Sequence, residues 1–68
     1  MKRYTANAAG MQIETGSLMQ AAKWCWDNRQ LHGAHVWDNL DDRTIYGPTG
    51  KRPRTTEDVL WRPAIYNV

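Results

Sequence analysis

The chain has one cysteine, no phenylalanine and no apolar run longer than three residues. Cys25 alone cannot form an internal disulfide, which excludes a disulfide-stapled secreted fold and favours a reducing compartment. The short apolar runs exclude a membrane-spanning segment and the core of a signal peptide. We therefore expect a soluble, cytoplasmic protein.

The length of 68 residues and the mass of 7.9 kDa leave room for one small domain, residues 1–68, and exclude a multi-domain enzyme. Without phenylalanine, the four tryptophans and three tyrosines must supply much of the core. The net charge of +2 is too small to identify a nucleic-acid-binding protein by itself.

A helix is predicted over residues 17–30. Ser17 and Gln20 have capping-box spacing, and Gly33 offers a left-handed exit just beyond the end. At about 100° per residue, one face of this helix is apolar and is predicted to form the core. That face carries Leu18, Ala21, Ala22, Cys25 and Trp26.

Two hairpins are predicted to flank the helix, one from residues 2–7 and 11–15 and the other from residues 34–39 and 43–46. In the second hairpin a period of two places Val36 and Ile45 toward the helix. The same period sends His35, Trp37 and Tyr46 to the opposite face of the sheet. We expect the α+β class, with a four- or five-stranded antiparallel sheet and a single α-helix packed on one face.

The Gly-Pro-Thr-Gly sequence at residues 47–50 indicates a turn that separates a compact unit, residues 1–47, from a C-terminal arm, residues 48–68. Within the arm, residues 59–61 and 64–68 have an extended pattern, and Pro63 favours an edge or bent strand. The pattern leaves two roles open for the arm: a strand of the sheet or a binding segment.

The residue types needed for catalysis or metal binding are sparse. Cys25, His32 and His35 are spaced Cys-x6-His-x2-His, which matches no standard zinc site, so a buried thiol and two loop or solvent histidines are favoured. The acidic stretch 38–42 lacks the glycine and glutamate positions of a calcium loop and is typical of a turn. The sequence indicates no Gly-rich phosphate-binding loop, no Ser/His/Asp set on predicted elements and no buried carboxylate pair. We expect no enzymatic activity, cofactor or metal.

The strongest charge feature is the loop 51–54, in which three cations flank a proline. Together with Arg3, Lys23, Arg29 and Arg43 it could form a basic patch, and Trp37 and Tyr46 could then act as a platform on which single-stranded bases stack. The alternatives are a solvated loop, docking onto an acidic protein, or a structural pairing of Arg52 or Arg54 with the turn at residues 38–42.

Trp24 falls outside the apolar face of the predicted helix. It is expected either to join Lys23 in a partner surface, where tryptophan is enriched at binding hot spots, or to be covered by the C-terminal arm through Trp61 or Tyr66.

Residues 12–33 resemble a family. The run Gln12-Ile13-Glu14, Ser17-Leu18, Gln20-Ala21 and His32-Gly33 resembles, in the same order and without a gap, a type I-F anti-CRISPR protein encoded by phages and related mobile elements. Gly50-Lys51-Arg52 extends the similarity. Proteins of this family look like small antiparallel sheets with one helix packed across them.

The resemblance implies a non-catalytic inhibitor that binds a CRISPR surveillance complex in the bacterial cytoplasm, near the place where target DNA would pair. In the family a basic pair on the helix contacts the partner; Lys23 keeps one cation, whereas Ala22 and Asp27 replace basic residues. The alternative function is a small nucleic-acid-binding module. The predicted partner-binding residues are Lys23, Trp24, Arg29, Trp37, Tyr46, Lys51, Arg52 and Arg54.

Overall fold

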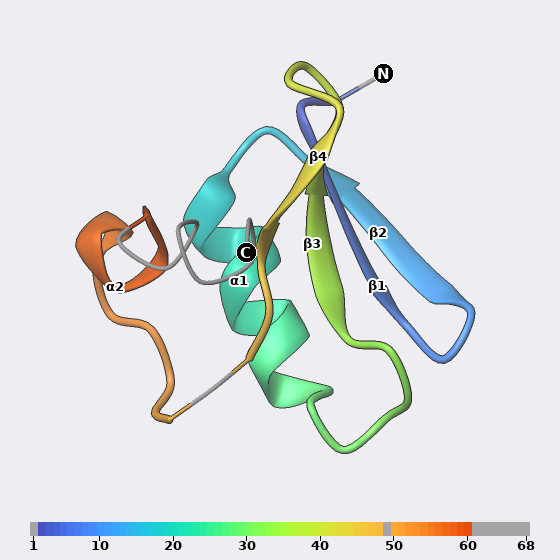
Figure 1. Cartoon of the computed structure of the whole chain (residues 1–68), viewed down its shortest axis with the longest axis vertical. Helices are drawn as coiled ribbons and strands as arrows, with labels where there is room; N and C mark the ends of the chain where they lie inside the picture. Colours follow the sequence, from blue (N-terminus) through green and yellow to red (C-terminus); the bar gives the residue numbers. More distant parts are fainter. Residues whose placement is uncertain (1, 49, 61–68) are drawn as a thin grey trace.

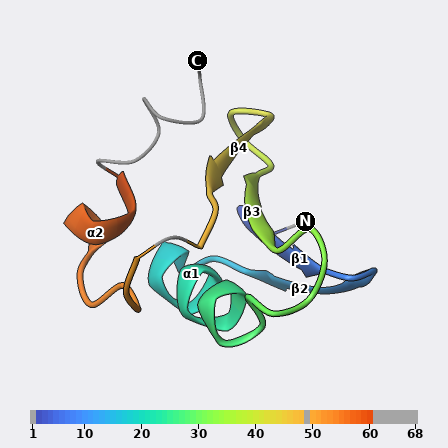
Figure 2. The same ribbon diagram turned by 60° about the horizontal axis from the view of Figure 1, so that its bottom comes forward.

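The computed structural model describes residues 2–48 and 50–60. In chain order the elements are β1 (Tyr4–Ala8), β2 (Met11–Thr15), α1 (Leu18–Asp27), β3 (His35–Asp38), β4 (Arg43–Tyr46) and α2 (Thr56–Leu60) (Figure 1). The strands form one antiparallel sheet in the order β2-β1-β3-β4. Figure 2 shows α1 along one face of this sheet and α2 on the β4 side, away from β2. The predicted α+β class is confirmed, with four strands in the described part of the chain.

The first hairpin turns through two residues. Ala9 and Gly10 both have positive φ angles, 50° and 85°, the arrangement of a tight turn whose twist suits a β-hairpin. The Ala9 amide donates to the His32 carbonyl at 2.8 Å, which holds the tip of this hairpin against the connection between α1 and β3.

The start of α1 uses the predicted cap but closes it differently. The Gln20 amide donates to the Ser17 hydroxyl oxygen at 3.2 Å, as the capping-box spacing predicts. The Gln20 side chain, however, accepts from the hydroxyl of Thr15 at 2.7 Å, and that same Thr15 oxygen accepts from the Ser17 amide at 3.1 Å. Thr15, the last residue of β2, thus links the strand to the helix.

Helix α1 ends at Asp27 and not at Gln30, so the predicted helix was three residues too long. The Asn28 side-chain nitrogen donates to the Trp24 carbonyl at 2.8 Å, and the Asn28 amide also donates to that carbonyl. Asparagine competes in this way for backbone groups and favours helix ends over helix interiors. The chain then leaves through a turn and Gly33, whose φ is 72°.

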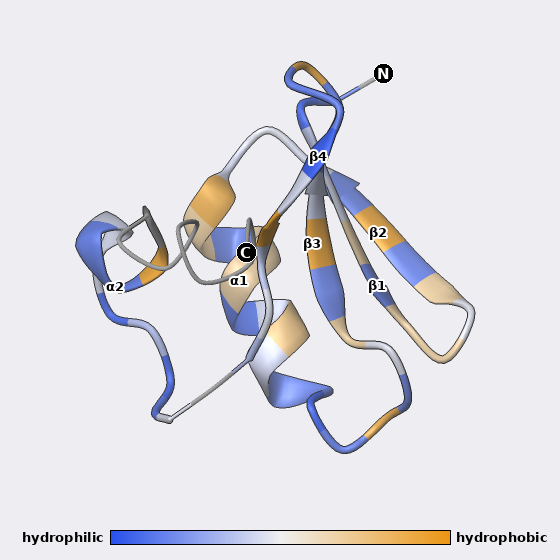
Figure 3. Ribbon diagram, in the orientation of Figure 1, coloured by the Kyte–Doolittle hydropathy of each residue, from blue (hydrophilic) through white to orange (hydrophobic). Residues whose placement is uncertain are grey.

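The core lies between α1 and the sheet. Apolar side chains alternate with polar ones along β2 (Figure 3), as a sheet covered on one face requires. Partly buried side chains, Ile13 and Leu18 among them, pack around the edge of the core. The buried cluster consists of Ala6, Ala21, Ala22, Cys25, Val36, Ile45, Tyr46 and Val59.

Tyr46 was predicted on the sheet face opposite the helix, and this was wrong. It is 1% exposed and belongs to the core cluster. The register shifts between Val36 and Trp37, so that Val36 pairs with Tyr46 and Trp37 pairs with Thr44. This irregularity inserts Ile45 into β4, which breaks the period of two and sends both Ile45 and Tyr46 inward.

Residues 59–60 were predicted as extended but belong to α2. The Asp58 carboxylate accepts from the backbone amides of Arg54 and Thr55 at 2.8 and 3.1 Å, which satisfies donors at the start of this short helix. Val59, fully buried, ties α2 to the core cluster. Trp61 and the predicted strand 64–68 lie outside the described residues. Within the described part, no helix has the length and apolar content that crossing a bilayer demands.

Candidate partner-binding surface

An ion pair joins the basic loop to α1. The Arg52 guanidinium donates from Nε to Asp27 Oδ1 at 3.1 Å and from Nη2 to Asp27 Oδ2 at 3.2 Å, a two-pronged geometry typical of arginine and a carboxylate. This hydrogen bond is the main cause that lowers the pKa of Asp27. Both side chains are about half exposed. The pair therefore orders the loop on the surface of the helix without being buried by it.

Pro53 fixes the other side of the loop. Its side chain is fully buried, whereas the flanking Arg52 and Arg54 side chains are exposed. The Asp58 carboxylate, which accepts the Arg54 and Thr55 amides, holds the backbone that follows. Contacts at Asp27, Pro53 and Asp58 thus present the loop cations outward from an ordered backbone.

The end of α1 adds a stacked cation to this region. The Arg29 guanidinium carbon lies 4.3 Å from the centre of the Trp26 ring, and its Nη1 donates to the Trp26 carbonyl at 3.0 Å. This geometry is a cation–π contact. Trp26 was assigned to the core face from the helical period; it is only half-buried and is absent from the core cluster. The i, i+3 spacing of Trp26 and Arg29 is the sequence signal for this contact.

Five of the predicted partner-binding residues lie on two neighbouring segments, α1 with the turn after it and the loop 51–54. Lys23 lies one turn before Asp27 on the same side of α1, and Arg52 reaches Asp27 from the loop. Figure 1 shows the 50–55 segment running beside the lower half of α1. Among the described residues, the Lys23 and Arg54 side chains take part in no ion pair. We call this region the basic surface: Lys23, Arg29, Lys51, Arg52 and Arg54.

The basic surface has a net positive charge although two carboxylates, Asp27 and Asp58, lie close to its cations. Asp27 is paired with Arg52, and Asp58 is engaged by backbone amides and lies near Lys51. The backbone amides of Arg54 and Thr55 are the main cause that lowers the pKa of Asp58. Both carboxylates are therefore ionised at neutral pH and already occupied, which leaves cations to face a partner.

Trp24 packs against the core cluster and is partly buried. Helix α2, which belongs to the C-terminal arm, contributes Val59 to the same cluster. Of the two roles predicted for Trp24, this arrangement fits packing in the core rather than partner binding. The cover proposed from Trp61 or Tyr66 lies outside the described residues. On the surface of α1, the basic side chain of Arg29 stacks on Trp26 rather than on Trp24.

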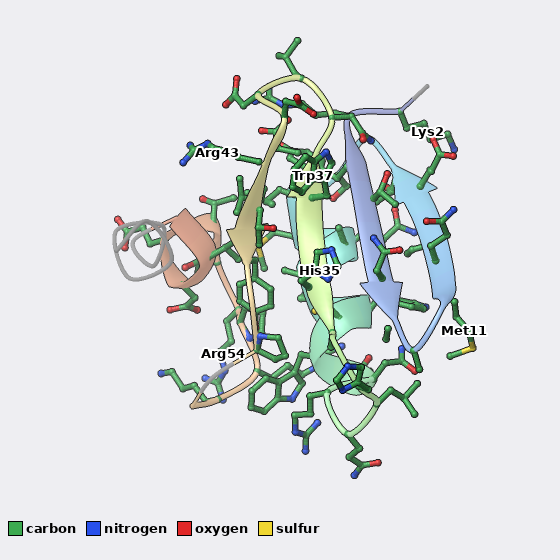
Figure 4. All side chains as sticks on the ribbon, turned by 45° about the vertical axis from the view of Figure 1, so that its right-hand side comes forward. Lys2, Met11, His35, Trp37, Arg43 and Arg54 are labelled. Atoms are coloured by element: carbon green, nitrogen blue, oxygen red, sulfur yellow. The ribbon has the colours of Figure 1, made fainter. Side chains whose placement is uncertain are left out.

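Trp37 lies apart from the basic surface, on the sheet face opposite α1. Register places it in a row with Thr5, Glu14 and Thr44, and His35 lies beside Asn7 in the next row. Figure 4 shows His35 and Trp37 on this open face. The strand residues that line it carry one charge, that of Glu14. Because Tyr46 is in the core and the cations are elsewhere, the predicted combination of an aromatic platform with the basic loop does not form.

The turn at residues 38–42 does not pair with Arg52 or Arg54, so that structural alternative was wrong. Asp38 instead accepts from Arg3, and Asp41 lies 3.7 Å from the same guanidinium. The acidic stretch is a turn, with Asp42 at a φ of 57°.

The sulfur and imidazole groups lie in different surroundings. Cys25 is fully buried, and desolvation raises the pKa of its thiol to about 12. His32 is exposed, and His35 Nδ1 lies 2.8 Å from the Gly33 carbonyl oxygen. Over the described ranges, no three histidine, cysteine or carboxylate side chains are grouped so that they could hold a metal ion.

Comparisons with protein-family models, with curated proteins and with solved structures find no match to this chain.

Proposed function

We propose that the protein is a non-catalytic inhibitor that binds a host CRISPR surveillance complex through the basic surface and interferes with recognition of target DNA. The observation that carries the proposal is the Arg52–Asp27 pair, which brings the loop cations next to those of α1. The resemblance of residues 12–33 to type I-F anti-CRISPR proteins supplies the identity of the target.

The arrangement of the cations supports binding rather than a structural role. Lys51, Arg52 and Arg54 are exposed side chains on an ordered backbone, so a partner can use them at a small cost in conformational entropy. A crRNA-guided surveillance complex carries phosphates on its guide RNA, and cations on an inhibitor can contact these phosphates or acidic side chains near them. The half-buried Trp26 provides apolar contact area beside the cations.

A small nucleic-acid-binding module is the second candidate, since the same five cations can contact phosphates directly. In that function log affinity for DNA or RNA falls steeply as log salt rises, whereas a protein contact with apolar area depends less on salt. The open sheet face favours the first candidate, because its strand residues bring no cation to the side where Trp37 could stack on a base.

The test is a target-DNA binding assay with a purified type I-F surveillance complex. The wild-type chain is expected to inhibit DNA binding at a stoichiometric ratio and to be retained by the complex. The variant Lys51→Ser/Arg54→Ser is expected to weaken inhibition by about tenfold, with an almost unchanged melting temperature, because exposed charges contribute little to stability.

The matched control is Lys2→Ser/Arg43→Ser, which removes the same charge from exposed cations outside the basic surface. This control is expected to inhibit like the wild type. Equal loss in both double variants would show a net-charge effect and refute the basic surface as the site. A chain that leaves the complex fully active but binds free DNA with a steep salt dependence would establish the second candidate instead.

A further inference from the structure

The two edges of the sheet differ in how they are protected. β4 begins with Arg43, contains the irregularity at Ile45 and has α2 beside it. Bulges, basic residues and covering segments are the usual devices that prevent pairing at an edge. β2 is regular in its pairing, and its five residues contain no proline or lysine. Figure 1 shows β2 at the margin of the described sheet with no element beyond it.

At the free edge of β2, the backbone amide and carbonyl groups of two residues point away from the sheet. In a two-residue hairpin the pair that closes the turn, here Ala8 and Met11, exchanges hydrogen bonds, and such pairs then alternate along the strands. Met11, Ile13 and Thr15 therefore bond to β1. The amide and carbonyl groups of Gln12 and Glu14 point away from the sheet, and no strand among the described residues pairs with them.

We propose that two copies of this chain associate by pairing their β2 strands antiparallel, about a twofold axis at Ile13. Gln12 of each copy then lies opposite Glu14 of the other in a hydrogen-bonded pair. The outward amide and carbonyl groups of these residues form four inter-chain hydrogen bonds, and the two sheets join into one of eight strands. Such a contact is isologous and closes without further growth at this edge.

Charge selects this register from its neighbours. An axis at Glu14 places two carboxylates opposite each other, which is destabilising. An axis at Gln12 retains only one hydrogen-bonded pair within β2, that of the two Gln12 residues. The axis at Ile13 uses every outward group of the strand and places each Glu14 carboxylate beside an uncharged amide that donates to it.

The apolar side chains of β2 agree with the same axis. Ile13 is half-buried at the edge of the core, on the α1 side of the sheet, and the two Ile13 side chains meet at the axis as a close, non-hydrogen-bonded pair. Met11 is 50% exposed, and Figure 4 shows it beyond the outer end of β2. Pairing brings each Met11 opposite Thr15 of the other copy, which removes apolar surface from water.

The experiment is sedimentation equilibrium over a wide range of protein concentration, with charge variants at an exposed position. The wild type is expected to show a monomer–dimer equilibrium. Gln12→Glu places two carboxylate pairs across the axis and is expected to weaken the dimer by about fivefold, whereas Gln12→Lys pairs with Glu14 and is expected to strengthen it by a similar factor. Gln30→Glu and Gln30→Lys, at an exposed residue outside the sheet, are the matched controls and leave the equilibrium unchanged.

Cross-linking tests the register. Oxidation of Ile13→Cys is expected to give a covalent dimer, because Cβ atoms of a non-hydrogen-bonded antiparallel pair lie close to disulfide distance. Gln12→Cys is the control and is expected not to cross-link, since Gln12 faces Glu14 rather than itself. The native Cys25 is fully buried and does not compete. A wild type that is monomeric throughout, equal effects of Gln12→Glu and Gln12→Lys, or cross-linking of Gln12→Cys alone would overturn the proposal.

Discussion

Arg3 donates two hydrogen bonds to Asp38, from Nε to Oδ1 at 3.2 Å and from Nη2 to Oδ2 at 3.0 Å, across 35 positions of the sequence. Asp38 is 2% exposed and also accepts the backbone amides of Leu40 and Asp41, at 2.9 and 3.2 Å. One carboxylate thus holds both the segment before β1 and the turn between β3 and β4. The hydrogen bond from Arg3 is the main cause that lowers the pKa of Asp38.

Asp38→Asn is expected to lower the free energy of unfolding at pH 7 by about 2 kcal/mol, because the amide nitrogen cannot accept the bonds that one carboxylate oxygen accepts. A carboxylate whose pKa is lower in the folded state stabilises above its unfolded pKa of about 4, and this contribution is lost as pH falls through the folded pKa. Urea unfolding at pH 7 and at about pH 2 measures both effects. The gap between wild type and variant should shrink in acid; an equal gap at both pH values would contradict the assigned role of the ionised carboxylate.

Thr15→Val is expected to destabilise the protein by about 1–2 kcal/mol, and Ser17→Ala by about 1 kcal/mol. The valine keeps the volume but removes the hydroxyl that joins the Ser17 amide to the Gln20 side chain. Thermal unfolding of both variants measures these losses. Thr44→Val, on the open sheet face, is the matched control and should change stability by less than about 0.5 kcal/mol. A Thr15→Val protein as stable as this control would show that the link from β2 to α1 is unimportant.

The sequence was informative wherever local periodicity decides the structure. A period of two placed the four strands, and Ser17 with Gln20 placed the start of α1. The irregularity at Ile45 depends on how β3 and β4 pair, which local alternation cannot reveal. Tyr46 was therefore predicted on the wrong face of the sheet. The start of α2 carries a signal that the prediction of an extended segment at residues 59–61 did not use, because Thr55 and Asp58 have capping-box spacing.

The sequence predicted a patch of loop and helix cations that also included Arg3 and Arg43, but not the contact that joins the loop to the helix; Arg3 instead pairs with Asp38. The cations of the loop and the helix were recognised from their charge, yet 25 residues separate Arg52 from Asp27, and no local spacing indicates that they pair. From the sequence alone, Asp27 stands out only as an acidic residue where the resembled family has a basic one. Trp37 was correctly placed on the open face, but its position relative to the cations depends on which side of the sheet α1 covers, which only the folded chain settles.

Asp27→Asn is expected to loosen the basic loop and to accelerate tryptic cleavage after Lys51 and Arg54 by about twofold, because the amide holds Arg52 less strongly than a carboxylate does. Limited proteolysis under native conditions, followed by mass spectrometry, measures the rate. Asp42→Asn is the matched control, since asparagine accepts the positive φ of that turn residue. High salt should narrow the difference between Asp27→Asn and wild type, because the pair is exposed and screened. Equal cleavage at low salt would show that the ion pair does not order the loop.

The variants Trp24→Ala and Trp26→Ala are expected to differ, the first lowering stability and the second lowering partner binding. Trp24 packs against the buried cluster, so its truncation should lower the free energy of unfolding by about 2 kcal/mol or more. Trp26 is half-buried and is stacked by Arg29, so Trp26→Ala should cost less stability. If the proposed function holds, it should also weaken binding to the proposed surveillance complex, as loss of an aromatic hot spot does. Chemical unfolding measures the loss of stability, and the target-DNA binding assay with the surveillance complex measures the loss of inhibition, both on the same samples. A folded Trp24→Ala protein that loses binding, with Trp26→Ala still active, would reverse the assignment and place Trp24 in the partner surface.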